Sequence, residues 1–320
     1  MSRICAELHC HTLHSDALFT PEELAEAARD NQIDLIALTD HNTLSGYAQM
    51  EQTGLPFIHG IEWTTFYGHM LVLGARAFVD WRDAEMDNID EKIAQVRAQD
   101  GLVGIAHPFA PGSPMCTGCY WDFRVRDWSR VNYIEVWNED FPPLAPHNRR
   151  AVALWCSLLD QGYHIAPTYG RDWHRETFSP VPRGCTYLEA EAADEASALS
   201  AIAGGRTLLS LGPDVRWSLL GEDGIYAPGD TAKPGAYACR FEIDGERRRS
   251  RWERFGIRAK EAVLLGRQGR VLARAAAPSG TMDVRLEDTP FVRLEIRGEA
   301  CGRESVLALS APVYVAEKEG

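Results

Sequence analysis

A His-x-His pair near the start of the chain is the strongest local signal for metal chemistry. His9 and His11 follow the apolar run 4–8, which we expect to form a strand. Alternate residues of a strand point to the same face, so the two imidazoles could bind one ion. Two histidines at this spacing also occur for structural reasons, so the pair needs support from the rest of the chain.

More histidines and carboxylates lie at the ends of other predicted strands or in the loops that follow them. They are Asp16, Asp40, His41, Glu62, His69, His107, Glu135, Asp172 and His174. The chain has 10 histidines, and their concentration at strand ends argues against a scatter over helix surfaces. Imidazole and carboxylate ligands suit manganese, zinc or iron, and a carboxylate can bridge two ions. We therefore expect two or three divalent metal ions in an open, hydrolytic site.

Strands that alternate with helices are predicted to position these side chains. The strands are expected at 4–8, 33–39, 57–61, 70–73, 102–106, 133–137 and 164–168, and the longer helices at 84–99 and 146–161. Another helix, ending near residue 30, has Thr20 as N-cap, then Pro21, and a capping box closed by Glu23. The alternation favours a parallel α/β barrel, whose catalytic groups gather at the carboxyl ends of the strands.

The pattern changes after a last predicted helix at 194–203. Glycines at 204, 205 and 212 are followed by short alternating strands and turns, which fit an antiparallel β-sandwich. We therefore expect two domains, a metallohydrolase barrel over residues 1–210 and a C-terminal β-sandwich-like domain over residues 211–320.

The composition of the 320-residue chain narrows the functional classes. A net charge of −13 disfavours an extended nucleic-acid surface, although a narrow site could still take a nucleotide end. No apolar run reaches the roughly 18 to 20 residues that span a bilayer, and no secretory leader is visible. We expect a cytoplasmic protein that contacts no membrane. Its eight cysteines should stay reduced, with Cys116 and Cys119 in a loop.

Several motifs together resemble the polymerase-and-histidinol-phosphatase (PHP) superfamily, in the family's order. They are His9-Cys10-His11-Thr12-Leu13-His14-Ser15-Asp16, Thr20-Pro21-Glu22-Glu23-Leu24, Leu38-Thr39-Asp40-His41-Asn42-Thr43, Gly60-Ile61-Glu62, Ala106-His107-Pro108, Ile134-Glu135-Val136-Trp137-Asn138 and Gly170-Arg171-Asp172-Trp173-His174. The resemblance covers roughly residues 4–175. Ala17 departs from it, because a glycine usually follows the Ser-Asp pair. Two further segments, 205–213 and 308–315, resemble the carbaryl-hydrolase-like branch, which carries a β-rich C-terminal part.

The resemblance implies a distorted (β/α)7 barrel with up to three metal ions. Its ligand groups would be His9, His11, Glu62 and Asp172 for one ion, Glu62, His107 and Glu135 for a second, and Asp16, His41 and His174 for a third. Glu135 or Asn138 could instead only orient neighbouring ligands. Asp40 is expected to hydrogen-bond a ligating imidazole.

Cationic side chains bear on the class of substrate, because a phosphate ester needs charge or donors on its oxygens. Arg171 and Arg206 lie in motif segments and could either bind substrate or belong to the surface. Further candidates are Arg149, Arg150 and Arg183. His69 could contact substrate, support a ligand or fix a strand end. The aromatic stretch 111–127 could cover the metals or pack as a surface loop.

We expect hydrolysis of a small phosphorylated substrate by a metal-bridging hydroxide, with Glu62 as the bridging ligand. Asp172 or His174 would pass a proton to the leaving group. Two alternatives stay open: hydrolysis of an amide, ester or carbamate by the same ions, and a non-catalytic metal-binding barrel. The sequence permits an oligomer without indicating one.

Overall fold

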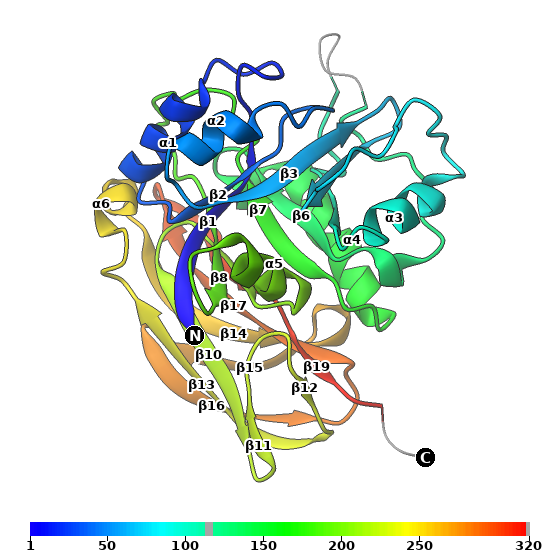
Figure 1. Ribbon diagram of the computed structural model, residues 1–320. Coiled ribbons are helices and arrows are strands. Elements are labelled where there is room, and N and C mark those ends of the chain that lie inside the picture. Colours follow the sequence, from blue (N-terminus) through cyan, green and yellow to red (C-terminus); the bar gives the residue numbers. More distant parts are fainter. Residues whose placement is uncertain (113–117, 318–320) are drawn as a thin grey trace.

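The computed structural model describes residues 1–112 and 118–317. Figure 1 shows the N-terminal strands and helices in the upper part of the molecule and the C-terminal strands in the lower part. Cys116 and part of the stretch 111–127 lie outside the described residues. Among the described residues, Cys5, Cys10, Cys156, Cys185, Cys239 and Cys301 are free thiols.

Seven strands of the N-terminal part follow one another in both sequence and space. They are β1 (Ser2–Cys10), β2 (Leu35–Leu38), β3 (Phe57–Thr64), β4 (His69–Leu73), β5 (Leu102–Ile105), β6 (Tyr133–Asn138) and β7 (Ala166–Gly170). Their connections hold α1 (Pro21–Asp30), α2 (Tyr47–Gln52), α3 (Ile89–Arg97), η1 (Trp128–Arg130), η2 (Pro142–Leu144) and α4 (Pro146–Asp160). The capping box predicted for α1 is present, with Thr20 and Glu23 bonding reciprocally.

One strand of this barrel runs against the others, which the sequence did not predict. β1, β2 and β3 pair in parallel, as do β5, β6 and β7, but β4 is antiparallel to both β3 and β5. The physical reason is the short connection from Thr64 to His69, because a parallel crossover needs about a dozen residues. The barrel is therefore not a regular succession of seven βα units, and the turn brings His69 to the same end as the carboxyl ends of the parallel strands.

The chain continues with β8 (Cys185–Ala190), α5 (Glu195–Ala203) and β9 (Thr207–Ser210). β8 pairs antiparallel with β1, β9 with β8, and β18 (Arg303–Ser310) with β9. One sheet thus runs from the barrel into the C-terminal strands, across the boundary predicted at residue 210. The domain boundary at residue 210 stays a prediction. The hydrogen-bonded sheet is not interrupted there.

The remaining strands form two facing layers. The large sheet includes β12 (Thr231–Ala232), β14 (Arg258–Leu265), β15 (Val271–Ala276), β17 (Phe291–Ala300) and β19 (Val313–Val315). The second sheet has the order β11 (Gly224–Tyr226), β10 (Asp214–Gly221), β13 (Gly235–Asp244) and β16 (Ser279–Leu286). Short helical turns α6 (Arg249–Trp252), η3 (Glu253–Phe255) and η4 (Arg267–Gly269) complete the chain. Alternate residues of β13, including Cys239 and Phe241, are buried in the core shared with β14, as expected for a sandwich.

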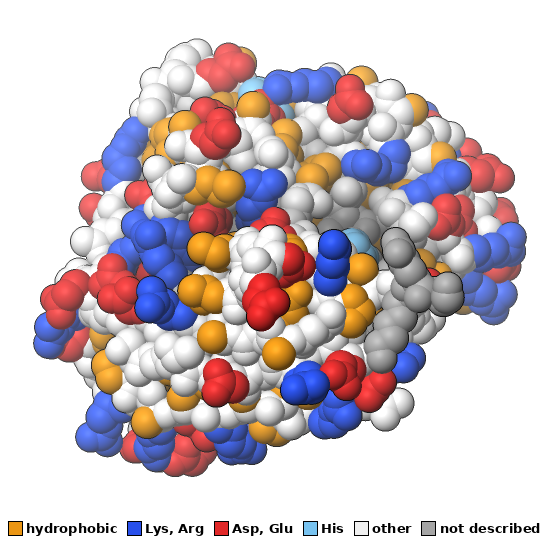
Figure 2. Space-filling model, turned by 90° about the horizontal axis from the view of Figure 1, so that it is seen from below, with side chains coloured by type: hydrophobic (Ala, Val, Ile, Leu, Met, Phe, Trp, Pro, Cys, Tyr) orange, Lys and Arg blue, Asp and Glu red, His pale blue; other side chains and the backbone are white. Residues whose placement is uncertain are grey.

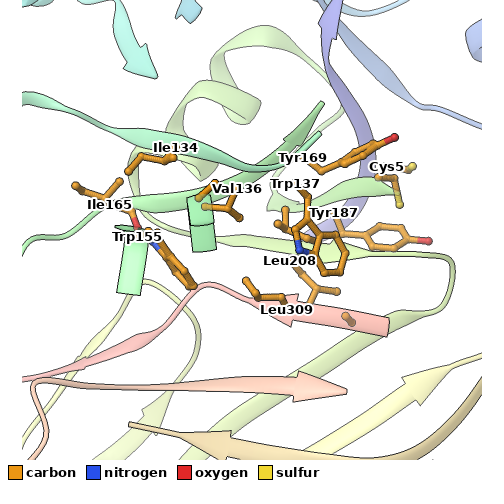
Figure 3. Close-up of a cluster of buried hydrophobic side chains, with 14 of the residues drawn as sticks. Cys5, Ile134, Val136, Trp137, Trp155, Ile165, Tyr169, Tyr187, Leu208 and Leu309 are labelled. Atoms are coloured by element: carbon orange, nitrogen blue, oxygen red, sulfur yellow. Dashed lines mark hydrogen bonds between the residues drawn. The ribbon is translucent and has the colours of Figure 1, made fainter. Parts of the chain in front are cut away.

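A common hydrophobic core joins the barrel to the C-terminal layers. Figure 3 shows Trp137 of β6 and Trp155 of α4 near Leu208 of β9 and Leu309 of β18. Trp155 also donates a hydrogen bond from Nε1 to the backbone oxygen of Ile165, at 2.8 Å. Because the two parts share one close-packed core, a change in the packing of one part affects the stability of the other.

The lower face of the molecule, in Figure 2, carries acidic and basic side chains side by side and no single broad basic field. Within residues 1–112 and 118–317, none of the helices has the length and apolar character that crossing a bilayer requires.

Candidate metal centre

The carboxyl end of β1 is tied to the loop after β7, and this tie assembles the first donors. His11 N–H donates to the Trp173 oxygen at 3.0 Å, and Trp173 N–H donates to the His9 oxygen at 2.9 Å. Asp172 and His174 flank Trp173, so both are held beside the His-x-His pair. The barrel thereby brings together residues that are more than 160 positions apart in the sequence.

A second backbone tie places Glu62 next to the segment after β2. Glu62 N–H donates to the Thr39 oxygen at 3.1 Å, and Asn42 N–H donates to the Glu62 oxygen at 3.0 Å. His41 therefore lies beside Glu62, and the two residues pair in an isolated parallel β-bridge.

The first predicted ligand group is assembled as a compact cluster. Glu62 Oε2 lies 3.1 Å from His9 Nε2 and 3.3 Å from His11 Nε2. Asp172 Oδ1 lies 3.4 Å from His9 Nε2 and 3.0 Å from His11 Nε2. The four ligand atoms lie within 4.8 Å of one another, a spacing that a single ion can fill.

These four atoms are also buried without a hydrogen-bond partner in the described part of the chain. A buried polar atom left without a partner costs about 1–3 kcal/mol, so four at one point are unusual in a native structure. A divalent cation would satisfy all of them at once. The donor set therefore fits a metal ion.

The second group contains His69 in place of the predicted Glu135. Glu62 Oε1 lies 2.8 Å from His69 Nδ1 and 3.2 Å from His107 Nε2. The two oxygens of Glu62 thus face two different sets of histidines, which is the arrangement of a bridging carboxylate.

Glu135 instead lies behind His9. Its Oε2 accepts a hydrogen bond from His9 Nδ1 at 2.9 Å, and its Oε1 accepts one from Asn138 Nδ2 at 2.6 Å. This arrangement favours the alternative in which Glu135 orients a ligand, and it makes His69 the candidate for the second group.

The third group consists of His11, Asp16, His41 and His174. Asp16 Oδ1 lies 3.0 Å from His174 Nε2 and 3.5 Å from His41 Nε2. The Asp16 side chain is 59% exposed, whereas Glu62 is fully buried. This group therefore forms the edge of the centre that faces solvent.

Several of the imidazoles are held by their second ring nitrogen. Nδ1 of His9 faces Glu135, Nδ1 of His107 faces the Cys119 oxygen at 3.3 Å, and Nδ1 of His174 faces the Asp172 oxygen at 2.8 Å. Each of these acceptors favours a proton on Nδ1 and leaves the Nε2 lone pair directed at the donor groups. Metal-ligating histidines are oriented in this way by their outer partners.

The electrostatics of the cluster favour positive charge. Burial would raise the pKa of Glu62, but His9, His69 and His41 hold it well below its usual range. Burial would likewise lower the pKa of His107, yet the neighbouring Glu62 carboxylate raises it to about 9. Burial lowers the pKa of His11 to about 4, so this ring is neutral at pH 7 and can donate a lone pair.

The backbone is strained at the same place. Asn42, His107 and Asp172 have positive φ values of 51°, 24° and 53°. Non-glycine residues in this region carry local strain that the surrounding fold must hold, and such residues concentrate at functional sites.

Residues 7–95 match the PHP domain. The matched segment contains His9, His11, Asp16, His41, Glu62 and His69, and the remaining donors follow it in the chain.

Two relatives with described activities are similar to parts of this chain. A 3',5'-nucleoside bisphosphate phosphatase from Chromobacterium violaceum is 34% identical over 76 residues, which are 21% of this chain and 27% of that protein. A 5'-3' exoribonuclease from Haemophilus influenzae is 35% identical over 63 residues, or 18% of this chain and 23% of that protein. The chain thus spans about a quarter of the length of these two relatives.

A solved structure has a similar fold along nearly the whole chain. It is a two-domain protein from Bacteroides vulgatus that contains a predicted PHP-like metal-dependent phosphoesterase. The likeness has a TM-score of 0.52 at 14% sequence identity and covers 98% of this chain and 95% of that one. The comparisons support the PHP domain and not the finer assignment to the carbaryl-hydrolase-like branch.

Two buried carboxylates of the PHP segment support the site in ways that the sequence did not predict. Asp40 accepts hydrogen bonds from Thr12 N–H at 2.7 Å and from the Ser15 hydroxyl at 2.7 Å, so it holds the loop after β1 and not an imidazole. Glu7, which sequence reasoning missed, accepts a bond from Arg171 N–H at 2.8 Å. Burial raises the pKa of Glu7 to about 7. An acidic residue inside an apolar strand was the available signal.

The side chains of the two arginines predicted to bind substrate contact residues outside the donor groups. Arg171 stacks on Trp173 with its guanidinium carbon 3.7 Å from the ring centre, and it reaches Glu176 at 3.4 Å. Arg206 contacts Met1 at the start of β1, roughly 25 Å of strand from His9. The structure therefore does not support Arg206 as a substrate-binding residue, because the motif segment that contains it lies at the opposite end of the barrel.

Arg150, another candidate cation, contacts two aromatic residues that lie close to His107 and Cys119 in the sequence. Its guanidinium carbon is 4.4 Å from the Phe109 ring centre, and Nη2 donates to the Tyr120 hydroxyl at 2.9 Å. Phe109 follows His107 by two residues, and Tyr120 follows Cys119, whose oxygen faces His107. The aromatic pair thus holds an exposed arginine beside the second donor group.

Proposed function

We propose that this protein is a metal-dependent phosphoesterase of PHP type, with two or three divalent ions held by three adjoining donor groups. The observation that carries the proposal is the quartet of buried, unpartnered atoms on His9, His11, Glu62 and Asp172. The match to the PHP domain and the likeness to a phosphatase over part of the chain support the same chemistry.

The donor groups assign the ligands. His9, His11, Glu62 and Asp172 would hold one ion, Glu62, His69 and His107 a second, and His11, Asp16, His41 and His174 a third. Bound manganese, zinc or iron would supply positive charge to the phosphoryl oxygens and acidify a water molecule. Glu62 would hold the first two sites at a fixed separation, because each of its oxygens belongs to a different group.

We infer that Asp172 or His174 handles the proton of the leaving group when the third site holds no ion, because His174 Nε2 is then not a ligand. His174 Nδ1 is held by the Asp172 oxygen, and the His174 side chain is 30% exposed, so it lies at the open edge of the centre. A proton donor must reach the leaving oxygen directly or through one water, and this edge is where a substrate enters.

Arg150 is the cation that we assign to the substrate. Phosphate monoesters carry negative oxygens beyond those that ions neutralise, and an arginine fork binds them with directional hydrogen bonds. Phe109 and Tyr120 hold its guanidinium by ring contacts at 4.4 and 5.5 Å, which lowers the entropy lost on binding.

An activity assay separates this function from the alternatives. Protein supplied with manganese is tested against an aryl phosphate, an aryl carbamate and a 5'-phosphorylated oligoribonucleotide, the last because one relative is an exoribonuclease. Release of phosphate from the aryl phosphate, abolished by chelation and restored by manganese, is the expected result. Turnover of the carbamate alone would replace the proposal with an amide or carbamate hydrolase. Metal binding without any turnover would indicate a non-catalytic barrel.

A further inference from the structure

A separate pocket lies where the barrel meets the C-terminal layers. It has a volume of about 370 Å³ and is bounded by the segment after His174 on one side and by α6 and η3 on the other. Figure 1 shows α6 beside α1, and Arg248 Nη2 donates to the Asn31 oxygen at the end of α1 at 3.1 Å. The volume is in the range of sites for small organic ligands.

The charge of this junction pocket is opposite to that of the chain. Its lining includes four arginines, at positions 183, 248, 251 and 254, and one carboxylate, Glu176, while the whole chain has a net charge of −13. Glu176 already pairs with Arg183 at 3.0 Å and with Arg171 at 3.4 Å. A hollow lined by one sign of charge concentrates the field and attracts ions of the opposite sign.

Three of these arginines have no carboxylate partner. Within residues 1–112 and 118–317, no carboxylate oxygen lies within 4.0 Å of the guanidinium nitrogens of Arg248, Arg251 or Arg254. Arg254 donates one long hydrogen bond, 3.4 Å, to the Ser179 oxygen. By contrast, Arg249 of the same segment pairs with both Glu246 and Glu253 and does not line the pocket. In the segment 247–254, the arginines without a carboxylate partner are thus the ones that line the pocket.

An exposed aromatic ring adjoins the unpaired cations. Phe178 lines the pocket and is 82% exposed, the largest exposed fraction among the large hydrophobic side chains of the described residues. Arg254 lies over this ring at 5.3 Å and over the buried Phe255 at 4.7 Å. A free ring next to an arginine is a surface on which another planar group stacks.

The pocket is connected to the edge of the metal centre. A second hollow shares Asn31, Glu176 and Arg251 with it and extends to Leu18 and Arg175. This second hollow is more acidic, because Glu23, Glu26 and Asp30 also line it. Leu18 N–H donates to the His174 oxygen at 2.8 Å, so this end lies directly beside the third donor group. The junction pocket therefore adjoins a hollow whose far end lies beside His174.

We propose that the junction pocket is a binding site for an organic anion with a planar ring, separate from the metal centre. Arg251 and Arg254 bind the anionic group, and Phe178 stacks on the ring. The ligand is either the distal end of a long substrate or a separate effector, and both sources share this chemistry.

Calorimetric titration with 2-naphthalenesulfonate tests the site, because this planar anion has no phosphoester bond to hydrolyse. We expect one molecule bound per chain, at least tenfold weaker binding to the Arg251→Ala/Arg254→Ala variant and several-fold weaker binding to Phe178→Ala. Arg249→Ala, in the same segment but outside the pocket, should bind as the unaltered protein does. The uncharged 2-naphthol should bind at least tenfold more weakly.

Removal of metal separates this proposal from the proposed hydrolysis. Binding of 2-naphthalenesulfonate should persist in chelated protein, whatever the outcome of the activity assay. The proposal is overturned if the double variant, still folded by circular dichroism, binds with unchanged affinity, or if binding disappears with the metal.

Turnover of phenyl phosphate then identifies the source of the ligand. A change in its kcat at saturating 2-naphthalenesulfonate, lost in the double variant, supports an effector site. Unchanged phenyl phosphate kinetics in the double variant, together with a raised KM for a nucleotide-sized aromatic phosphate, supports a site for the distal end of the substrate. If the protein turns over phenyl phosphate and neither change occurs, the pocket does not serve the reaction and the proposal fails.

Discussion

Glu62 is the residue on which the donor groups depend, because its two oxygens face different histidines. Replacement by glutamine keeps the shape and removes the negative charge. We expect Glu62→Gln to lose at least one bound ion and to lower phosphate release by at least about 100-fold, since the bridge would lose its charge-based affinity. Metal analysis and a phosphatase assay measure both effects. Glu26→Gln, exposed on α1, should behave as the unaltered protein, and full activity in Glu62→Gln would contradict the assignment.

Arg150 and Arg206 form a matched pair for testing substrate binding. Arg150→Ala should raise the KM for an aryl phosphate about tenfold with a smaller change in kcat, because a charge-assisted hydrogen bond to substrate is lost. Arg206→Ala should leave both constants unchanged, because Arg206 lies at the opposite end of the barrel beside Met1. The reverse pattern in steady-state kinetics would restore Arg206 as the substrate-binding cation.

The positions of most candidate ligands could be predicted from residue type and strand ends alone. His69 was among the candidates listed from the sequence, but the ligand groups implied by the family resemblance did not include it. The antiparallel β4 brings His69, at the start of that strand, to the edge where the parallel strands end. Glu135 was expected to be a ligand, but its carboxylate hydrogen-bonds His9 and Asn138. The position of a residue on a strand does not predict such side-chain contacts.

The metal centre requires β7 to pack closely against β1. A Cβ on Gly170 would lie 2.4 Å from the Cβ of His9 and 2.5 Å from Glu135 Oε2. We expect Gly170→Ala to displace His9, to reduce metal content and to destabilise the fold by about 1–3 kcal/mol, the usual cost of overpacking. Urea unfolding and metal analysis check this. Gly245→Ala, where nothing lies within 4 Å of the added carbon, is the control. Unchanged stability and metal content in Gly170→Ala would show that β1 and β7 can separate without harm.

Periodicity and caps predicted elements of the barrel well, as α1 illustrates with its Thr20 cap and Glu23 capping box. Strand direction was predicted less well. The run 70–73 has the same apolar character as its parallel neighbours, because β4 is buried as they are. Only the length of the turn before His69 distinguishes the two directions.

At the scale of the whole molecule, the sheet and the core cross the predicted domain boundary. β18 pairs with β9, and the Arg3 Nη2 atom donates to Asp214 Oδ1 at 2.8 Å. A change in strand length and glycine content reveals where the chain's pattern changes. It does not reveal that the later strands extend the earlier sheet, because pairing partners distant in sequence leave no local signal.

A fragment of residues 1–210 should therefore not fold stably alone. Truncation of the chain at residue 210 would expose the edge of β9. It would also expose apolar residues such as Leu208 and Trp155, which are buried in the complete chain. Circular dichroism and size-exclusion chromatography should show aggregation or no cooperative melting. A monomeric fragment that melts at the temperature of the complete chain would instead establish residue 210 as the boundary of an independent domain.

The three donor groups draw on β1, β3 and β4 and on the segments after β1, β2, β5 and β7, so the metal centre depends on the packing of the whole N-terminal part. An anomalous difference map from crystals grown with manganese tests its existence most directly. We predict at least two peaks, one against His9, His11, Glu62 and Asp172 and one against Glu62, His69 and His107. A map with no peak at either group, from crystals that contain manganese, would contradict the account.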